Sequence, residues 1–207
     1  MKFDDYYMNM AYLVAMKSKD KSTHIGAVVV GPDNEVRSVG YNSFPRGIDD
    51  NVAERQERPE KYFWFEHAER NAVYNATLLG TSLKECRMYS NGIPCMDCAR
   101  SIVQAGIKEV IVDKYWDDNN DDIWIENANR TKILFQEAGV KLRFWEGELV
   151  TIKRFKRGKV FEWKLFGKIY QDMKENIKLV ILVLLKMEEK VDKVAQQLGG
   201  PTWKIKK

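Results

Sequence analysis

The sequence predicts an α/β protein with a main domain over residues 1–146 and a basic C-terminal extension over residues 147–207. Between residues 67 and 145, short apolar stretches typical of strands alternate with amphipathic stretches typical of helices. Such alternation favours parallel strands with helices on the faces of the sheet. After residue 146 the alternation stops and an apolar heptad pattern replaces it.

The main domain begins with an expected amphipathic helix over residues 4–19, whose apolar stripe ends at the polar "SKDKS". "IGAVVV" (25–30) and "EVRSVGY" (35–41) then flank "GPDN", which supplies turn residues for a hairpin. A long polar loop follows over residues 42–62. Loops of this length inside compact domains are often functional.

Three helices and three strands are expected in the rest of the domain. Each helix is followed by a glycine, which is the usual residue at a helix end. The expected helices are 67–79, 95–105 and 126–138, and the expected strands are 86–90, 108–113 and 140–145.

The extension is expected to form a hairpin around "KRGK" and then a long helix that ends at "GGP" (199–201). Its apolar residues follow a heptad over four repeats, which favours a coiled coil. An amphipathic helix packed on its own subunit also fits, and the wide apolar stripe at 179–185 favours burial in a bundle or subunit interface. The heptad positions are Tyr170, Met173, Ile177, Val180, Leu184, Met187, Val191, Val194 and Leu198.

Charge is unevenly distributed along the chain. Residues 151–207 hold 15 Lys/Arg and 6 Asp/Glu, whereas the rest of the chain is mildly acidic. A basic tail suits an acidic partner, nucleic acid or an anionic ligand, although a solvated helix face is the simpler explanation. Three cysteines give no disulfide framework, and the longest apolar run of seven residues is too short for a bilayer. We therefore expect a soluble cytoplasmic protein with no membrane partner.

"HAE" (67–69) and "PCMDC" (94–98) carry the strongest chemical signal. His67, Cys95 and Cys98 provide the imidazole and thiolate ligands that zinc prefers. Cys95 and Cys98 are one helical turn apart, and a helix N-terminus stabilises thiolates. Three protein ligands leave one position for water, which is typical of catalytic zinc.

Alternatives exist for each part of this pattern. Cys95 and Cys98 alone could form a redox dithiol, and His67 with Glu69 could be an ordinary helix start. His24 or Cys86 could supply a fourth ligand, but each fits a structural position beside a strand better. The joint occurrence of both motifs favours the zinc site.

Together the motifs resemble the H-x-E…P-C-x-x-C signature of zinc-dependent base deaminases. "YYMNMAYLVAMKSKDKSTHIGAVVV", "GYNSFPRG", "HAERNAV", "PCMDCARSIVQAGIKEVI" and "DKYWDD" further make residues 6–145 similar to deoxycytidylate deaminases. This resemblance implies a three-layer α/β/α sandwich around a five-stranded mixed sheet. It also implies one zinc per chain and hydrolytic deamination of dCMP to dUMP with release of ammonia, upstream of thymidylate synthesis.

The resemblance also implies roles for individual residues. Glu69 would be the general acid/base that moves protons between water, the ring and the departing amine. Asn42, Tyr115 and Ala68 would contact substrate, although Tyr115 also fits a plain strand end. A nucleotide-effector loop would include Gly40, Tyr41, Ser43 and Gly47.

Regulation and assembly are also implied by the resemblance: activation by dCTP, inhibition by dTTP with Mg²⁺, and a homohexamer. Two positions depart from the family pattern. Ser43 replaces the usual glycine, which weakens the case for the effector loop, and Arg70 replaces a common leucine. Arg70 could meet a phosphate or a neighbouring subunit, or lie exposed on its helix.

Other functions fit some of the same residues. The enzyme could act on dCTP, on both nucleotides, or on cytosine or adenine in a polynucleotide. The acidic main domain has no evident interleaving of basic and aromatic residues around the motifs, which argues against a nucleic-acid partner. A zinc-stabilised assembly protein built around the heptad helix is the alternative outside enzymology.

Overall fold

The computed structural model describes residues 1–119 and 122–150 of the chain. After residue 150 it describes 154–156, 159–161, 175–181, 185–187, 190, 193–194 and 197. The chain divides into two compact units, Met1–Val150 and Thr151–Lys207.

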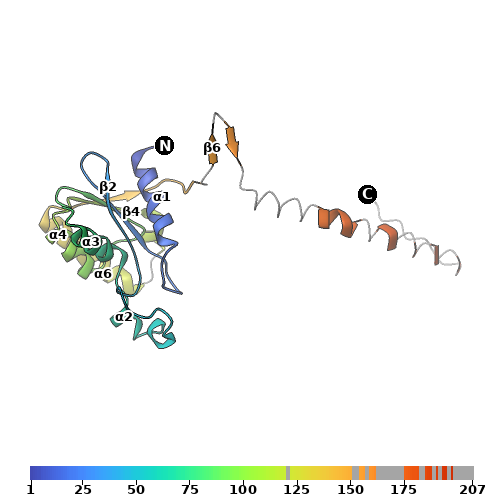
Figure 1. The fold of residues 1–207 in the computed structure, drawn as a ribbon, viewed down its shortest axis with the longest axis horizontal. Coiled ribbons are helices and arrows are strands. Elements are labelled where there is room, and N and C mark those ends of the chain that lie inside the picture. Colours follow the sequence, from blue (N-terminus) through green and yellow to red (C-terminus); the bar gives the residue numbers. More distant parts are fainter. Residues whose placement is uncertain are drawn as a thin grey trace. The chain divides into compact units, whose positions relative to one another are not determined.

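A five-stranded mixed sheet forms the centre of the first unit, in the order β2-β1-β3-β4-β5 (Figure 1). β1 (Gly26–Val30) pairs antiparallel with β2 (Val36–Tyr41) and with β3 (Arg87–Ser90). β3, β4 (Glu109–Asp113) and β5 (Lys141–Trp145) run parallel. The predicted α/β fold, with a hairpin followed by parallel strands, is confirmed.

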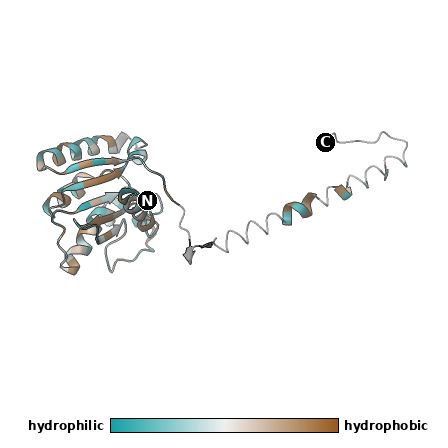
Figure 2. Ribbon diagram, turned by 90° about the horizontal axis from the view of Figure 1, so that it is seen from above, coloured by the Kyte–Doolittle hydropathy of each residue, from teal (hydrophilic) through white to brown (hydrophobic). Residues whose placement is uncertain are grey.

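Helices cover both faces of this sheet. α1 (Phe3–Ala15) packs on one face, while α3 (Ala68–Leu79), α4 (Met96–Gln104) and α6 (Asp122–Ala138) belong to the other layer. Figure 2 shows that these helices carry both hydrophobic and hydrophilic residues, as amphipathic surface helices do. The arrangement is the expected three-layer sandwich.

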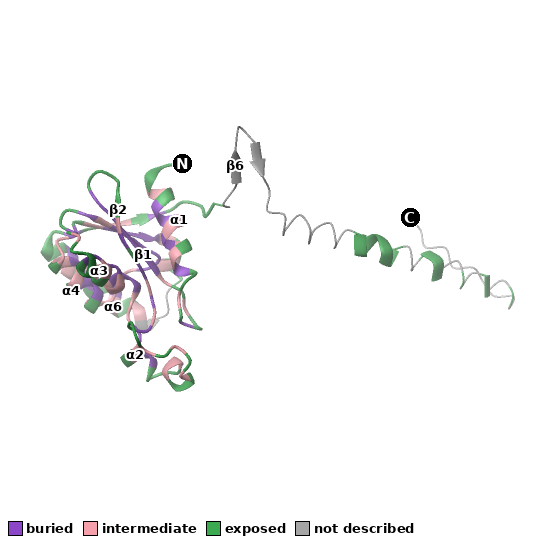
Figure 3. Ribbon diagram, in the orientation of Figure 1, coloured by how far each residue is buried: buried purple, intermediate pink, exposed green. Residues whose placement is uncertain are grey.

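Alternation along β1 explains why two cores form. Val28 and Val30 pack in the cluster with Tyr7 and Met8 of α1, whereas Val29 packs in the cluster that includes α3 and α4. Successive side chains of a strand point to opposite faces, so a strand buried on both faces is apolar at every position. Figure 3 shows the central strands largely buried and the exposed residues on the outer sides of the helices.

Short helices are where the structure adds to the sequence prediction. The predicted loop at 42–62 contains a 3₁₀ turn, η1 (Ala53–Gln56), and leads into α2 (Lys61–Trp64). A further helix, α5 (Lys114–Asp118), follows β4 and is capped by Asp113, whose Oδ1 accepts a hydrogen bond from the Tyr115 N–H. Helices of one turn are too short to show a 3.6-residue period, so the sequence pattern does not reveal them.

In the second unit, β6 (Arg154–Lys156) and β7 (Lys159–Phe161) pair antiparallel around the predicted turn. Residues 175–181 and 185–187 are helical within the predicted long helix. Four heptad residues are helical and exposed: Ile177, Val180, Met187 and Val194. The other heptad residues and the "GGP" end lie outside the described residues: Tyr170, Met173, Leu184, Val191, Leu198 and 199–201. In the described part of the chain, no helix is long and apolar enough to cross a membrane.

Gly40 is required by the close approach of β2 to α3. A Cβ atom at this position would lie 2.2 Å from the Ala68 carbonyl oxygen and 2.3 Å from the Ala72 nitrogen. We expect Gly40→Ala to lower the free energy of unfolding by about 1–3 kcal/mol, because the helix backbone must move away from the strand. Urea denaturation of the full chain measures this change.

Gly47→Ala is the matched control for Gly40. Gly47 has a φ of +80°, but a Cβ atom added there would meet nothing within 4 Å, so only backbone strain of about 1 kcal/mol opposes the change. A loss at Gly40 no greater than that at Gly47 would contradict the packing explanation.

Candidate active site

Three side chains converge where α3 and α4 begin. His67 and Cys95 are the N-cap residues of these helices, and Cys98 lies in the first turn of α4. The Cys95 Sγ lies 3.5 Å from the Cys98 Sγ and 3.4 Å from the His67 Nδ1, and the Cys98 Sγ lies 3.6 Å from that Nδ1. The sequence motifs thus meet in space as predicted.

The donor atoms fit a zinc ion. Zinc bonds of about 2.3 Å to sulfur and about 2.0 Å to nitrogen at a tetrahedral angle put ligand atoms about 3.5–3.8 Å apart. The observed separations match this spacing. Hydrogen bonding with Cys98 and His67 lowers the pKa of Cys95 to about 4, so this thiol ionises readily. Within the described residues, no other His/Cys/Asp/Glu group has metal-binding spacing, and Cys86 lies elsewhere as a buried free cysteine.

Glu69 lies beside this group without belonging to it. Its side chain is buried, and its Oε2 is 3.6 Å from the Cys98 Sγ. His67 has the extended backbone of an N-cap (φ −77°, ψ 155°), so the pair does not follow the spacing of a regular helix. Burial raises the pKa of Glu69 above its usual value. A buried carboxyl group beside a metal-binding group is suited to accepting and donating a proton during a reaction.

Helix α6 holds the segment that carries Cys95. The Asn127 Oδ1 accepts a hydrogen bond from the Met96 N–H at 2.9 Å, and the Thr131 hydroxyl donates to the Pro94 carbonyl at 2.8 Å. Asn127 and Thr131 are one helical turn apart, so they face the same side. Neither residue is predicted from the sequence, where their i, i+4 spacing on one helix face is the only available signal.

A cavity of about 440 Å³ opens on this group. His67, Glu69 and Cys95 line it together with aromatic side chains that include Phe65, Trp116 and Trp124. The cavity lies near the carboxyl ends of β3 and β4, where α4 and α5 follow those strands. Such edges are the usual ligand sites of open α/β sheets, and the volume suits a small organic molecule.

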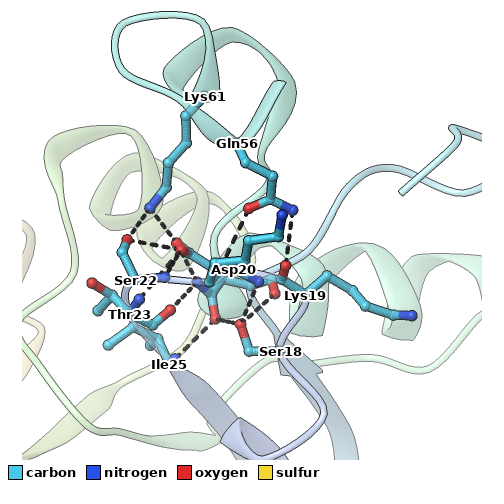
Figure 4. Close-up of polar contacts among 10 residues, drawn as sticks. Ser18, Lys19, Asp20, Ser22, Thr23, Ile25, Gln56 and Lys61 are labelled. Carbon is cyan, nitrogen blue, oxygen red and sulfur yellow. Dashed lines mark hydrogen bonds and ion pairs between the residues drawn. The ribbon is translucent and has the colours of Figure 1, made fainter. Parts of the chain in front are cut away.

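A polar network fixes another part of the cavity wall (Figure 4). Lys61 of α2 forms an ion pair with the Asp20 Oδ2 at 2.6 Å and donates to the Ser22 hydroxyl at 2.6 Å. Asp20 and Lys61 are both buried, and hydrogen bonds from Lys61 and Ser22 lower the pKa of Asp20 despite the opposing effect of burial. Figure 4 shows Lys61 and Gln56 reaching from the segment before α3 to residues 18–25.

Comparison with known proteins shows which family this chain is similar to. A family model described as the cytidine and deoxycytidylate deaminase zinc-binding region matches residues 1–114, which is more than half of the chain. The chain belongs to this family.

Proteins from distant organisms are similar to this chain. The deoxycytidylate deaminase of Homo sapiens is 38% identical over 150 residues, covering 69% of this chain and 79% of the human protein. ComE operon protein 2 of Bacillus subtilis is 27% identical over 181 residues, covering 82% of this chain and 85% of that protein. The crystal structure of the cyanophage S-TIM5 dCMP deaminase in complex with dCMP and dUMP is similar with a TM-score of 0.57 and 25% identity. That similarity covers 70% of this chain and 99% of the cyanophage chain.

Asn42, which the family resemblance makes a substrate contact, lines the cavity but is already saturated with hydrogen bonds. Its Nδ2 donates to the Asp20 carboxylate and the Thr23 carbonyl, and its Oδ1 accepts from the Ser18 hydroxyl and the Ile25 N–H. A ligand contact would have to replace or share one of these four bonds. The substrate role of Asn42 stays a prediction, and in the structure this residue organises the cavity wall.

The other residues assigned by family resemblance lie in different settings. Ala68 is buried against the cavity, and Tyr115 lines it while 75% exposed. Within the part of the chain that the structure describes, the four proposed effector residues do not line this cavity, and their role stays a prediction: Gly40, Tyr41, Ser43 and Gly47.

Arg70, the unusual residue of the family motif, packs against the metal-binding group. Its Nε donates to the Glu66 carboxylate at 2.6 Å, and its Nη1 lies 3.9 Å from the Cys98 Sγ. A guanidinium at this position stabilises negative charge on the thiolate. Among the settings considered for Arg70, exposure on the helix is excluded, because its side chain is only 15% exposed.

Proposed function

We propose that this protein is a hydrolase that converts dCMP and water to dUMP and ammonia, with zinc bound by His67, Cys95 and Cys98. The observation that carries this proposal is the buried Glu69 carboxyl group beside a three-ligand metal group, at the wall of a cavity of nucleoside size. Membership of the cytidine and deoxycytidylate deaminase family supports it. The named activity of relatives, including the cyanophage enzyme that binds dCMP and dUMP, supports the choice of substrate.

Different residues would bind the metal, transfer protons and exclude water in the proposed reaction. A zinc ion held by the three ligands would lower the pKa of a bound water molecule toward neutrality. Glu69 would accept one proton of the attacking water and deliver it to the ring nitrogen. It would then take the hydroxyl proton of the adduct and pass it to the amine, which leaves as ammonia while the C=O bond of dUMP forms. Phe65, Trp116 and Trp124 provide apolar walls that exclude bulk water around the ring.

A substrate panel tests the proposal. Ammonia release is measured with dCMP, dCTP, deoxycytidine and single-stranded DNA on the full-length protein. We expect dCMP to give the highest kcat/KM, and removal of metal by a chelator to stop the reaction until Zn²⁺ is restored. Activity on deoxycytidine alone would overturn the nucleotide assignment, and preference for dCTP would establish the triphosphate alternative.

Regulation and assembly form a further part of the proposal. From the family resemblance we infer activation by dCTP, inhibition by dTTP with Mg²⁺, a cytoplasmic location and a homohexamer. The same assay with added dCTP or dTTP tests the effectors, and light scattering tests the subunit number. Residues 147–207 are proposed as a distinct basic extension, and their net positive charge supports an acidic or anionic partner.

A further inference from the structure

The cavity wall carries two cationic side chains whose surroundings differ. Among the described residues, Arg58 and Lys61 are the only Lys or Arg side chains that line the cavity. Lys61 is held by Asp20 and Ser22, and its side chain is 10% exposed. Its charge is therefore already neutralised within the protein.

Arg58 has no such partner in the described part of the chain. No carboxylate there lies within ion-pair distance of its guanidinium, which instead lies 5.8 Å from the centre of the Tyr62 ring. Asp20 and Glu69 are the only described carboxylates of the cavity wall, and both are engaged: Asp20 with Lys61, and Glu69 beside the metal ligands. With respect to the described residues, Arg58 is thus a cation without a carboxylate partner at a cavity that Glu69 also lines.

The segment that carries Arg58 is fixed on both sides of it. Lys61 ties the segment to Asp20, and Gln56 donates to the Lys19 carbonyl at 3.1 Å while it accepts from the Lys21 N–H (Figure 4). Gln56 and Lys61 flank Arg58 in the sequence, and each of them contacts a residue about forty positions earlier in the chain. The arginine therefore belongs to an anchored wall, which lowers the entropic cost of binding through it.

We propose that Arg58 binds the 5′-phosphate of the nucleotide and so selects nucleotides over nucleosides. This inference rests on the proposed function. If the base of the nucleotide lies at Glu69 and the metal-binding group, its 5′-phosphate lies at another part of the cavity wall. The planar guanidinium donates two parallel hydrogen bonds that match phosphate oxygens. The guanidinium lies over the Tyr62 ring, where a cation–π contact favours this position.

Arg58→Ala and Arg58→Lys test the phosphate contact with dCMP and deoxycytidine as substrates. We expect Arg58→Ala to reduce kcat/KM for dCMP about 10- to 100-fold, mainly through KM, and to leave deoxycytidine unchanged. Arg58→Lys should fall between wild type and Arg58→Ala, because the charge stays but the paired geometry is lost. Equal losses for both substrates, or no loss for dCMP, would overturn the proposal.

Arg55→Ala is the matched control. Arg55 lies on the same segment, but its guanidinium stacks over Trp64 at 3.9 Å and it does not line the cavity. We expect it to leave the ratio of dCMP to deoxycytidine activity unchanged, whereas a drop as large as that of Arg58→Ala would show a general effect of the segment.

The affinities of wild type and Arg58→Ala for dUMP and deoxyuridine, measured by calorimetry, test this inference independently of the proposed function. Selective loss of dUMP affinity in Arg58→Ala supports the phosphate contact even if wild type fails to deaminate dCMP. Unchanged dUMP affinity contradicts it even if dCMP is the substrate.

Discussion

Glu69→Gln should reduce kcat for dCMP deamination by about 10²- to 10⁴-fold, which is the usual contribution of a positioned general acid/base. Glutamine fills the same buried space but cannot exchange a proton with water, ring nitrogen or amine. The side chain is not among the three metal-binding residues, so zinc content should stay at the wild-type level. The measurements are single-turnover kinetics and zinc content by mass spectrometry on the same sample.

Asp97→Asn is the control for Glu69. Asp97 lies in the first turn of α4, close to the metal ligands, but its side chain is 61% exposed and does not line the cavity. This control should keep activity within a few-fold of wild type. An unchanged rate in Glu69→Gln would remove Glu69 from the mechanism, and loss of zinc would make it a structural partner of the metal group.

Lys61→Met should lower the free energy of unfolding by about 3–5 kcal/mol at pH 7, because it leaves Asp20 charged and buried without a cation. Methionine keeps the apolar length of the lysine side chain, so the change removes mainly charge and hydrogen bonds. Urea denaturation measures the loss. Lys19→Met is the control, since Lys19 pairs with Asp50 at the surface, where such pairs contribute at most about 1 kcal/mol.

The pH dependence of the Lys61→Met effect has a defined sign. The folded-state pKa of Asp20 is lowered from 3.8, so the pair stabilises wild type above that pH and its contribution is lost as pH falls through the folded value. In the variant, burial without a cation raises the pKa of Asp20, and protonation relieves the penalty. The stability difference between the two proteins should therefore shrink between pH 7 and pH 4. A difference that is constant with pH would show that packing, not charge, explains the loss.

The sequence alone was sufficient to predict that His67, Cys95 and Cys98 converge, and to predict the main sheet. Strands such as 25–30 are buried on both faces, so they are apolar throughout and easy to recognise. Cys95 and Cys98 lie one turn apart, and their meeting with His67 follows once both helices begin at one edge of a sheet. Local pattern and tertiary structure agree at these positions.

Contacts between distant residues could not be predicted in the same way. Asp20 and Lys61 are two among many charged residues, and nothing in the sequence pattern pairs them. Asn127 and Thr131 are polar residues that would be assigned to the solvent side of a helix, yet Thr131 is fully buried. Asn42 could be placed at the site, but its four internal bonds depend on the fold of residues 18–25.

The support that α6 gives to the Pro94–Met96 segment has a consequence for biosynthesis. A ribosome makes the chain from its N-terminus, so His67 and both cysteines are synthesised before Asn127 and Thr131. β5, which completes the sheet, is made later still. A nascent chain that has just passed Cys98 therefore holds every donor atom of the metal group but not the scaffold that orients Cys95. We therefore expect correct metal loading to be a late event, after the chain beyond Thr131 has emerged, because α6 supplies the contacts that position the Pro94–Met96 segment.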